Sequence, residues 1–143
     1  MNSIQVKPIE SSEEILSTFP VMSQLRPDLK KEEYLPLVSS MMKEGYLLAA
    51  VLENSEIRSV AGYRFVTMLA HGKYLYVDDL VTDSSERSRN FGKILFDWLI
   101  TEARKRDCDQ FHLDSGVQRH GAHRFYFRER MIISAYHFAL KLK

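Results

Sequence analysis

The fold is indicated most clearly by the stretch DDLVTDSSERSRNFGK, residues 78–93. Its first part completes a tyrosine-rich segment, Lys73–Thr82, that predicts a β-strand. A polar turn follows, and from about Asn90 apolar residues recur with helical spacing, which predicts a long helix. The members of that apolar series are Phe91, Ile94, Leu95, Trp98, Leu99 and Ala103. A strand that turns directly into a helix is therefore the central unit of the chain.

The segments around this unit predict a mixed α/β fold. Tyr46–Glu53 and Arg58–Met68 precede it as strands, and with Lys73–Thr82 they form an antiparallel meander. The other predicted elements are a strand at Ile4–Ile9, a helix that begins at Ser11-Ser12 and is interrupted at Pro20, a helix from Lys31 to about Gly45, a strand at Gln110–Asp114, a helix at Gly121–Arg130 and a strand at Ile132–Leu140. This order favours one sheet with helices on both faces, in a single domain of residues 1–143.

Composition narrows the class of protein. The 143 residues carry a formal net charge of +1, which argues against a surface built throughout for nucleic acid. The longest aliphatic stretch, Tyr46–Leu52, is far shorter than the ~20 residues that span a bilayer, and no secretory signal is recognisable. The single cysteine, Cys108, excludes an internal disulfide framework. We therefore expect a cytoplasmic protein without a membrane or nucleic-acid partner.

The turn before the long helix has the chemistry of an anion site. The first amides of a helix have no partner within the helix and lie at the positive end of its dipole. Gly92 permits close approach to the backbone, Asn90 tolerates left-handed conformations, and three cations, Arg87, Arg89 and Lys93, add charge. A solvated basic helix start explains the same residues equally well on charge alone.

Two motifs in this chain resemble those of the GNAT superfamily of acyl-CoA-dependent N-acetyltransferases. Arg87-Ser-Arg-Asn-Phe-Gly92 resembles the family signature Arg/Gln-x-x-Gly-x-Gly/Ala. Ala122-His-Arg-Phe-Tyr-Phe-Arg-Glu-Arg-Met131 resembles the segment Ala-x-x-(apolar)-Tyr-x-x-x-Gly-Phe. The motifs lie in the family's order, and the predicted elements agree with its fold along nearly the whole chain. The resemblance implies a central, mostly antiparallel sheet with one splayed pair of parallel strands and helices on both faces.

The resemblance also implies an activity, the transfer of an acetyl group from acetyl-CoA directly to a primary amine of a small molecule or peptide. The acetyl-CoA would lie between the fourth and fifth strands, and the resemblance implies no metal ion in the site. The residues implied to bind it are Leu80, Val81 and Thr82 on the strand and Arg87, Ser88, Arg89, Asn90, Phe91, Gly92 and Lys93 in the turn. The backbone amide of Leu80 or Val81 would polarise the thioester carbonyl. Homodimers are common in the family, so a homodimer is compatible with the resemblance.

Two proton transfers accompany such a reaction. Tyr126 matches the position of the family's general acid and would protonate the leaving thiolate, although an aromatic run such as residues 125–127 also suits a core. Asp78 and Asp79 end the cleft-lining strand, and one of them, or a water molecule, would accept the proton of the amine. Neighbouring strand residues face opposite ways, so we expect only one carboxylate in the cleft and favour Asp78. Turn or cap roles for both remain open.

Asn90 and Arg130 depart from the family pattern, because each replaces a motif glycine. Asn90 can still supply a left-handed residue, whereas Arg130 adds bulk where the chain turns sharply. A CoA-binding module without turnover is therefore an alternative. A basic interaction domain is a second one, because residues 119–143 hold six Lys or Arg side chains and one acidic side chain, Glu129. The histidines 112, 120 and 123 lack a zinc-ligand pattern, so we expect no metal.

Overall fold

The computed structural model describes residues 3–143, with the side chain of Ser88 excluded. It comprises two compact units, one that ends at His112 and a smaller one that begins at Leu113, and each is described by itself. Among the described residues, no helix is long and apolar enough to cross a membrane.

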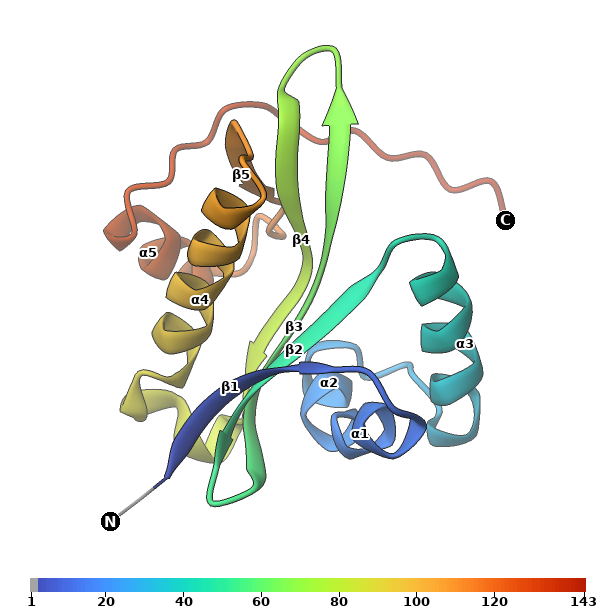
Figure 1. Cartoon of the computed structure of the whole chain (residues 1–143). Coiled ribbons are helices and arrows are strands. Elements are labelled where there is room, and N and C mark those ends of the chain that lie inside the picture. Colours follow the sequence, from blue (N-terminus) through green and yellow to red (C-terminus); the bar gives the residue numbers. More distant parts are fainter. Residues whose placement is uncertain (1–2) are drawn as a thin grey trace. The chain divides into compact units, whose positions relative to one another are not determined.

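The first unit is built on a sheet whose strands follow one another in chain order (Figure 1). The strands are β1 (Ile4–Ile9), β2 (Leu47–Glu53), β3 (Glu56–Met68), β4 (Gly72–Thr82) and β5 (Gln110–Leu113). The pairs β1–β2, β2–β3 and β3–β4 are antiparallel, which confirms the predicted meander. Strand β5 runs parallel to β4, so the sheet is mixed, as expected.

Three helices cover one face of this sheet: α1 (Ser12–Ser17), α2 (Phe19–Leu25) and α3 (Lys31–Lys43). Ser11 and Glu14 form a capping box that begins α1. Pro20 lies in the first turn of α2, where its missing N–H costs nothing, so it starts a second helix at the predicted interruption. The core beneath these helices contains Ile9, Ile15, Val21, Met22, Tyr34, Val38, Tyr46, Leu48, Ala50, Val60 and Val81.

The opposite face is covered by α4 (Phe91–Lys105), the helix predicted from its apolar periodicity. Its buried side chains are Phe91, Leu95, Phe96, Leu99 and Ala103. Trp98 and Ile94 are only half-buried, and the Trp98 ring lies edge-on to Tyr63 of β3. A short 3₁₀ turn, η1 (Ser84–Arg89), joins β4 to α4, so the predicted strand–turn–helix unit is confirmed.

The second unit contains one helix, α5 (His120–Arg128). Just beyond it, Arg130 takes a left-handed conformation with φ +69°, and the amide of Met131 donates to the carbonyl of Tyr126 at 3.0 Å. This hydrogen bond is typical of a helix that ends in a Schellman motif, whose left-handed position is usually glycine. The sharp turn of the family motif is therefore formed without its glycine.

The predicted strand at Ile132–Leu140 is wrong for the single chain, because residues 131–143 form neither strand nor helix. A strand exists only where a neighbouring strand accepts and donates its backbone hydrogen bonds. The sequence pattern shows which side chains would share a face, and it does not show whether a partner strand is present.

Substitution of Arg130 tests the left-handed turn. A non-glycine residue in this conformation is strained, so Arg130→Gly should raise the free energy of unfolding by about 0.5–1 kcal/mol in a denaturant titration. The matched control is Glu129→Gly, because Glu129 has φ −83° and the substitution there should lower stability by a similar amount. Destabilisation by both substitutions would contradict the assigned backbone conformation.

Candidate functional site

Strand β4 contains a bulge where its two aspartates lie. Gly62 of β3 is opposite Asp79, and the next residue, Tyr63, is opposite Val77, so no residue of β3 lies opposite Asp78 in the strand register. A bulge adds one residue to one strand, and it interrupts the alternation of side chains between the two faces. The bulge therefore changes which way the two carboxylates point.

Both aspartates contact groups gathered around Tyr46. The Asp79 carboxylate accepts a hydrogen bond of 2.7 Å from the Tyr46 hydroxyl. The Asp78 carboxylate binds Arg64 through both oxygens, at 3.0 and 2.7 Å, and this guanidinium lies 5.4 Å from the centre of the Tyr46 ring. The strict alternation behind the expectation that only one carboxylate faces the cleft does not hold at a bulge, and that expectation stays a prediction.

Helix α2 is attached to the same bulge by Arg26, the residue at its C-terminal end. Its guanidinium donates to the Asp79 carboxylate at 3.0 Å and to the Asp78 carbonyl at 3.0 Å. Burial, and then the charge of Asp79, raise the pKa of Tyr46 well above its usual value, so its hydroxyl keeps its proton and donates it. The result is a polar cluster of two carboxylates, two guanidinium groups and one phenol.

Gly62 makes room for this cluster. A Cβ atom at Gly62 would lie 2.7 Å from a carboxylate oxygen of Asp79 and would overlap the Tyr46 hydroxyl. A glycine within a strand often marks a bulge or a close approach of this kind. Gly62 is therefore the one feature of the sequence that could have indicated the bulge. Tyr46, Arg26 and Arg64 carry no comparable signal, and sequence reasoning missed them.

Beyond the bulge, Leu80, Val81 and Thr82 end β4 beside the turn. The Asp83 amide donates to the Arg58 carbonyl of β3 at 2.8 Å, and alternate residues of a strand direct their amides to the same edge. Val81 therefore faces β3, and its carbonyl accepts a hydrogen bond from Ser59 at 2.9 Å. The amides of Leu80 and Thr82 face the other edge of β4.

Strand β5 does not extend as far as Leu80. The Asp109 amide, just before β5, donates to the Lys73 carbonyl near the start of β4, and β5 ends at Leu113. Parallel strands advance together, so this pairing covers the first half of β4 and stops before the bulge. Strand β5 therefore leaves the Leu80 amide free to bind another acceptor.

The predicted anion site lies at the start of α4. Asn90 is left-handed, with φ +66° and ψ +17°, and its side chain does not cap the helix. The first hydrogen bond of the helix joins the Ile94 amide to the Asn90 carbonyl at 3.0 Å, so the preceding amides, of Phe91, Gly92 and Lys93, have no acceptor within the helix. These three amides form a donor set at the positive end of the helix dipole.

The side chains of this segment have different surroundings. Phe91 is buried, so only its backbone can reach a ligand. A Cβ atom at Gly92 would lie 3.1 Å from the Thr82 hydroxyl, which shows how closely the helix start approaches β4. Arg87 and Lys93 are both exposed, and the Lys93 ammonium lies 3.3 Å from the Asp97 carboxylate. The side chain of Ser88 lies outside the described part of the chain.

Arg89 is engaged by carboxylates instead of facing solvent freely. Its guanidinium donates to both carboxylate oxygens of Glu53, to one of them at 2.9 Å and to the other in a short contact. It also donates to the Glu86 carboxylate at 2.8 Å. Glu53 also accepts from Arg58 at 3.0 Å, and Arg58 lies 3.5 Å from Glu86. We call these four residues, Glu53, Arg58, Glu86 and Arg89, the charge ring.

The charge ring fastens η1 to the sheet. Glu53, at the end of β2, is 2% exposed, although its side chain is acidic. Arg89 and then Arg58 hold its pKa below the usual value, so the carboxylate stays charged at neutral pH. On the other side of the turn, Gln24 of α2 accepts from the Ser84 amide at 2.9 Å. Polar contacts from two directions therefore fix the turn.

Tyr126 belongs to the second unit. It lies in α5, half-buried, with its ring 5.6 Å from that of Phe125. Burial raises the pKa of the Tyr126 hydroxyl, and the nearby Arg119 opposes this shift. The hydroxyl is therefore protonated at neutral pH and can act as a proton donor.

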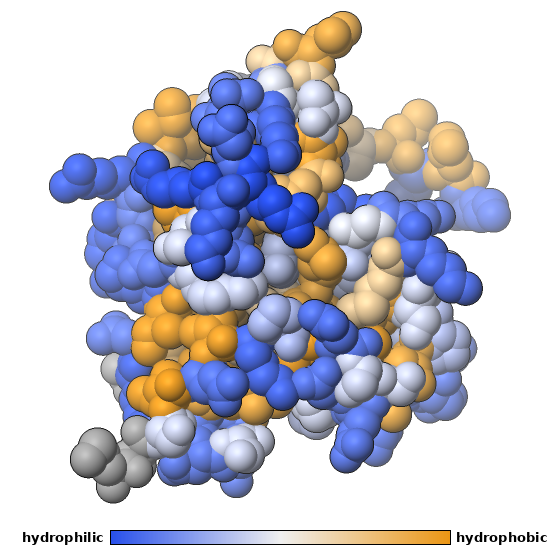
Figure 2. Space-filling model, in the orientation of Figure 1, coloured by the Kyte–Doolittle hydropathy of each residue, from blue (hydrophilic) through white to orange (hydrophobic). Residues whose placement is uncertain are grey.

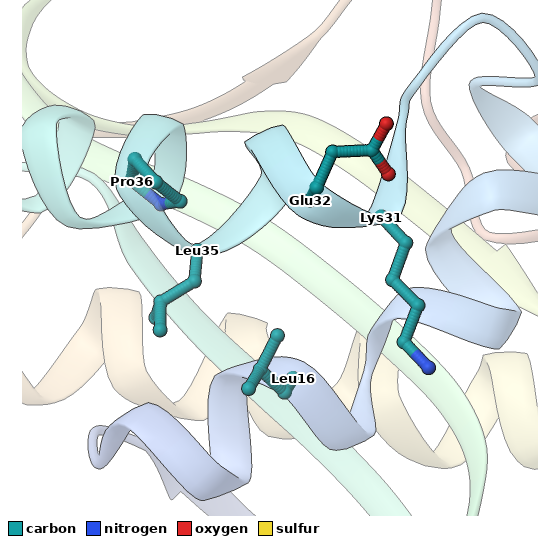
Figure 3. Close-up of a pocket in the computed structure, with 5 residues that line it drawn as sticks. All are labelled: Leu16, Lys31, Glu32, Leu35 and Pro36. Atoms are coloured by element: carbon teal, nitrogen blue, oxygen red, sulfur yellow. The ribbon is translucent and has the colours of Figure 1, made fainter.

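Other parts of the chain offer weaker candidates. A shallow hollow on the outer side of α1 and α3 is lined by Leu16, Lys31, Glu32, Leu35 and Pro36 (Figure 3). Leu16 and Leu35 point toward one another across it, and its only charged groups are one lysine and one glutamate. Within residues 3–143, no cluster of three or more His, Cys, Asp or Glu side chains is arranged to hold a metal ion.

Removal of the Glu53 charge tests how η1 is held. Glu53→Gln keeps the shape of the side chain but weakens its bonds to Arg89 and Arg58, so hydrogen exchange of the amides 84–90 should accelerate about tenfold or more. The native carboxylate has a lowered pKa, so its contribution is complete above the unfolded pKa and is lost as the pH falls through the lower folded value. The variant should lack this acid dependence.

Glu56→Gln is the matched control for this experiment. Glu56 also pairs with Arg58, at 3.2 Å, but it is exposed and does not contact η1. Exchange in residues 84–90 should therefore match that of the wild type. Equal exchange in both variants and the wild type would show that the charge ring does not hold the turn.

Comparisons with known proteins show what this chain is similar to in sequence and in fold. A family model described as the acetyltransferase (GNAT) family matches residues 12–130. The uncharacterized N-acetyltransferase YhdJ of Bacillus subtilis (strain 168) is 40% identical over 124 residues, which cover 86% of this chain and 87% of that protein. A transcriptional regulator of Bacillus halodurans C-125 matches with a TM-score of 0.85 and 18% identity, over 98% of this chain and 100% of that chain.

A second solved structure, an acetyltransferase of Trypanosoma brucei, matches with a TM-score of 0.79 and 20% identity, over 98% of this chain and 100% of that chain. At these identities the two solved structures show a shared fold. The family model and the relative from Bacillus subtilis show more, because they match most of the chain by sequence. The protein with this bulged β4 and this turn before α4 belongs to the GNAT family of acetyltransferases.

Proposed function

We propose that this protein is an N-acetyltransferase that moves an acetyl group from acetyl-CoA to a primary amine of a small molecule or peptide. The observation that carries the proposal is the start of α4, where three backbone amides follow the left-handed Asn90 in a chain of the GNAT family. A helix start of this kind suits phosphate groups, and acetyl-CoA carries a pyrophosphate.

The residues of the turn fit such a ligand. The amides of Phe91, Gly92 and Lys93 are donors for phosphate oxygens, and the absence of a side chain at Gly92 leaves the backbone accessible. Arg87 and Lys93 supply positive charge from exposed positions. In this proposal Arg89 acts indirectly, because its contacts with Glu53 and Glu86 hold the turn in shape.

The acetyl thioester supplies an acyl group that an amine can attack. We assign the Leu80 amide, rather than that of Val81, to polarise the thioester carbonyl, because Leu80 faces the edge of β4 that β5 leaves free. A fixed backbone donor suits this task, since it needs no rearrangement when negative charge develops on the oxygen.

Two side chains are assigned to proton transfer. Asp78 is the proposed acceptor for the amine proton, because its carboxylate is more exposed than that of Asp79, at 20% against 12%. Arg64 donates hydrogen bonds to both oxygens of the Asp78 carboxylate and so fixes the orientation of that carboxylate. Tyr126 is the proposed donor to the departing thiolate, since its hydroxyl is protonated at neutral pH.

Calorimetric titration with acetyl-CoA, with ATP and desulfo-CoA as comparison ligands, tests the cofactor. Gly92→Val should weaken acetyl-CoA binding at least tenfold, or ~1.4 kcal/mol, because the added carbons crowd Thr82 and cover the amides. Gly121→Val is the matched control, because a Cβ there, also in the first turn of a helix, meets nothing within 4 Å. Wild-type affinity in folded Gly92→Val would contradict the phosphate site.

Tyr126→Phe tests the proton donor. The substitution removes only the hydroxyl, so turnover in a thiol-release assay with a panel of amines should fall at least tenfold while the Kd for acetyl-CoA changes little. Unchanged turnover would remove Tyr126 from the mechanism. Acetyl-CoA binding by the wild type without turnover on any amine would favour the inactive CoA-binding module.

A further inference from the structure

The polar cluster at the β4 bulge presents charged groups to solvent. The side chain of Arg26 is 52% exposed and that of Arg64 is 29% exposed, whereas Tyr46 is buried. Exposed hydrophobic side chains of the same unit gather elsewhere, for example at the tip of the β3–β4 hairpin, where Leu69 is fully exposed (Figure 2). The exposed surface of the cluster is therefore charged, and it suits a charged ligand.

Each guanidinium group of the cluster has one nitrogen that the cluster does not use. Arg26 donates through Nε and Nη2, to the Asp79 carboxylate and the Asp78 carbonyl. Arg64 donates through Nε and Nη2 to the Asp78 carboxylate. The remaining nitrogen of each arginine, Nη1, has no hydrogen bond to a residue that the structure describes. Since both arginines bind Asp78, these donors lie close to the proposed proton acceptor.

The charges of the cluster balance before any ligand binds, because two carboxylates face two guanidinium groups. An acceptor that carries only an ammonium group adds a positive charge beside partly buried cations, where like charges repel more strongly than in water. A carboxylate on the same acceptor removes that excess. The Nη1 donors can bind it, since guanidinium and carboxylate groups form strong charge-assisted hydrogen bonds.

We propose that the acceptor is a free α-amino acid, and this assignment rests on the proposed acetyl transfer. Its amino group lies at the Asp78 carboxylate, and its carboxylate binds Nη1 of Arg26, the more exposed of the two guanidinium groups. A single carbon atom separates the amino and carboxylate groups of such an acceptor, which matches two protein groups that adjoin the same residue. A peptide N-terminus lacks this carboxylate, and a polyamine has a further cation instead.

The two guanidinium groups also favour the reaction itself. They disfavour a positive charge on the acceptor nitrogen, so its ammonium form loses a proton to Asp78 more readily. The neutral nitrogen then bonds to the acetyl carbon and gives up a second proton, the carbon–sulfur bond breaks, and the thiolate is protonated. The products are an N-acetylamino acid and CoA. Arg26 thus determines specificity, whereas Arg64 orients Asp78.

A thiol-release assay with matched pairs of acceptors tests the substrate class. Amino acids are compared with their primary amides, and spermidine and a short peptide with a free N-terminus complete the panel. For the preferred amino acid, kcat/KM should exceed that of its amide at least about tenfold, because the amide lacks the charge-assisted hydrogen bonds. The amide has the larger unprotonated fraction, since no carboxylate adjoins its amine, so a preference for the acid must come from the site.

Arg26→Gln tests the assigned residue. The ratio of kcat/KM for the amino acid to that for its amide should fall about tenfold, chiefly through a higher KM for the acid. A merely structural role would lower both substrates alike and leave the ratio unchanged. Arg26→Lys keeps the charge and should restore part of the ratio. Lys30→Gln is the matched control, because Lys30 is equally an exposed cation between α2 and α3, and its side chain does not cap α3.

The outcomes separate this assignment from the function on which it rests. Turnover without a preference for the acid over its amide, or an unchanged ratio in Arg26→Gln, would overturn the amino-acid assignment alone. A ratio that falls equally in Lys30→Gln would also overturn it, because the effect would then come from general surface charge. Acetyl-CoA binding without turnover on any member of the panel would overturn both the assignment and the proposed transfer.

Discussion

Strand β4 has one more residue than β3 can pair with, and the arrangement of the site depends on that extra residue. No residue of β3 lies opposite Asp78 in the register, and Asp78 and Asp79 both contact the surroundings of Tyr46. Gly62 makes the bulge tolerable, because any side chain there would displace the Tyr46 hydroxyl. Beyond the bulge, the register with β3 directs the Leu80 amide to the free edge. One bulge therefore positions both the proposed proton acceptor, Asp78, and the Leu80 amide, which is proposed to donate a hydrogen bond to the thioester carbonyl.

The proposed phosphate turn is held in a different way from the bulge. The bulge is packed against the buried side chain of Tyr46. In contrast, η1 lies at the surface, where ion pairs and hydrogen bonds hold it. Its anchor is Glu53, a buried carboxylate that would be costly without its guanidinium partners. Arg89 shows the consequence, because a cation that looks suited to phosphate is occupied by structural carboxylates. Charge counted along a sequence does not reveal which cations are available to a ligand.

Local patterns predicted much of the fold and of the α4 turn. The apolar period of α4, and the runs of Val, Leu, Ala and Tyr between short turns that predict β2 to β4, depend on neighbouring residues, which a sequence displays directly. The charge ring joins Glu53 to Arg89 across 36 positions, and the contact of Tyr46 with Asp79 spans 33, so neither leaves a local pattern. The prediction of a strand at residues 132–140 is wrong for a related reason. A strand forms only beside a partner strand, and the sequence of the segment itself does not show whether that partner is present.

The two departures from the family motifs illustrate what those motifs require physically. Asn90 and Arg130 both stand where the motif has glycine, and both adopt the left-handed conformation, with φ of +66° and +69°. The motif letter therefore encodes a backbone angle, and a different side chain can satisfy it at some cost. Asparagine tolerates that angle well, whereas arginine does not, so the two substitutions differ in strain and not in geometry. A missing motif glycine at these positions is consequently evidence about stability, and it is no evidence that the site has been lost.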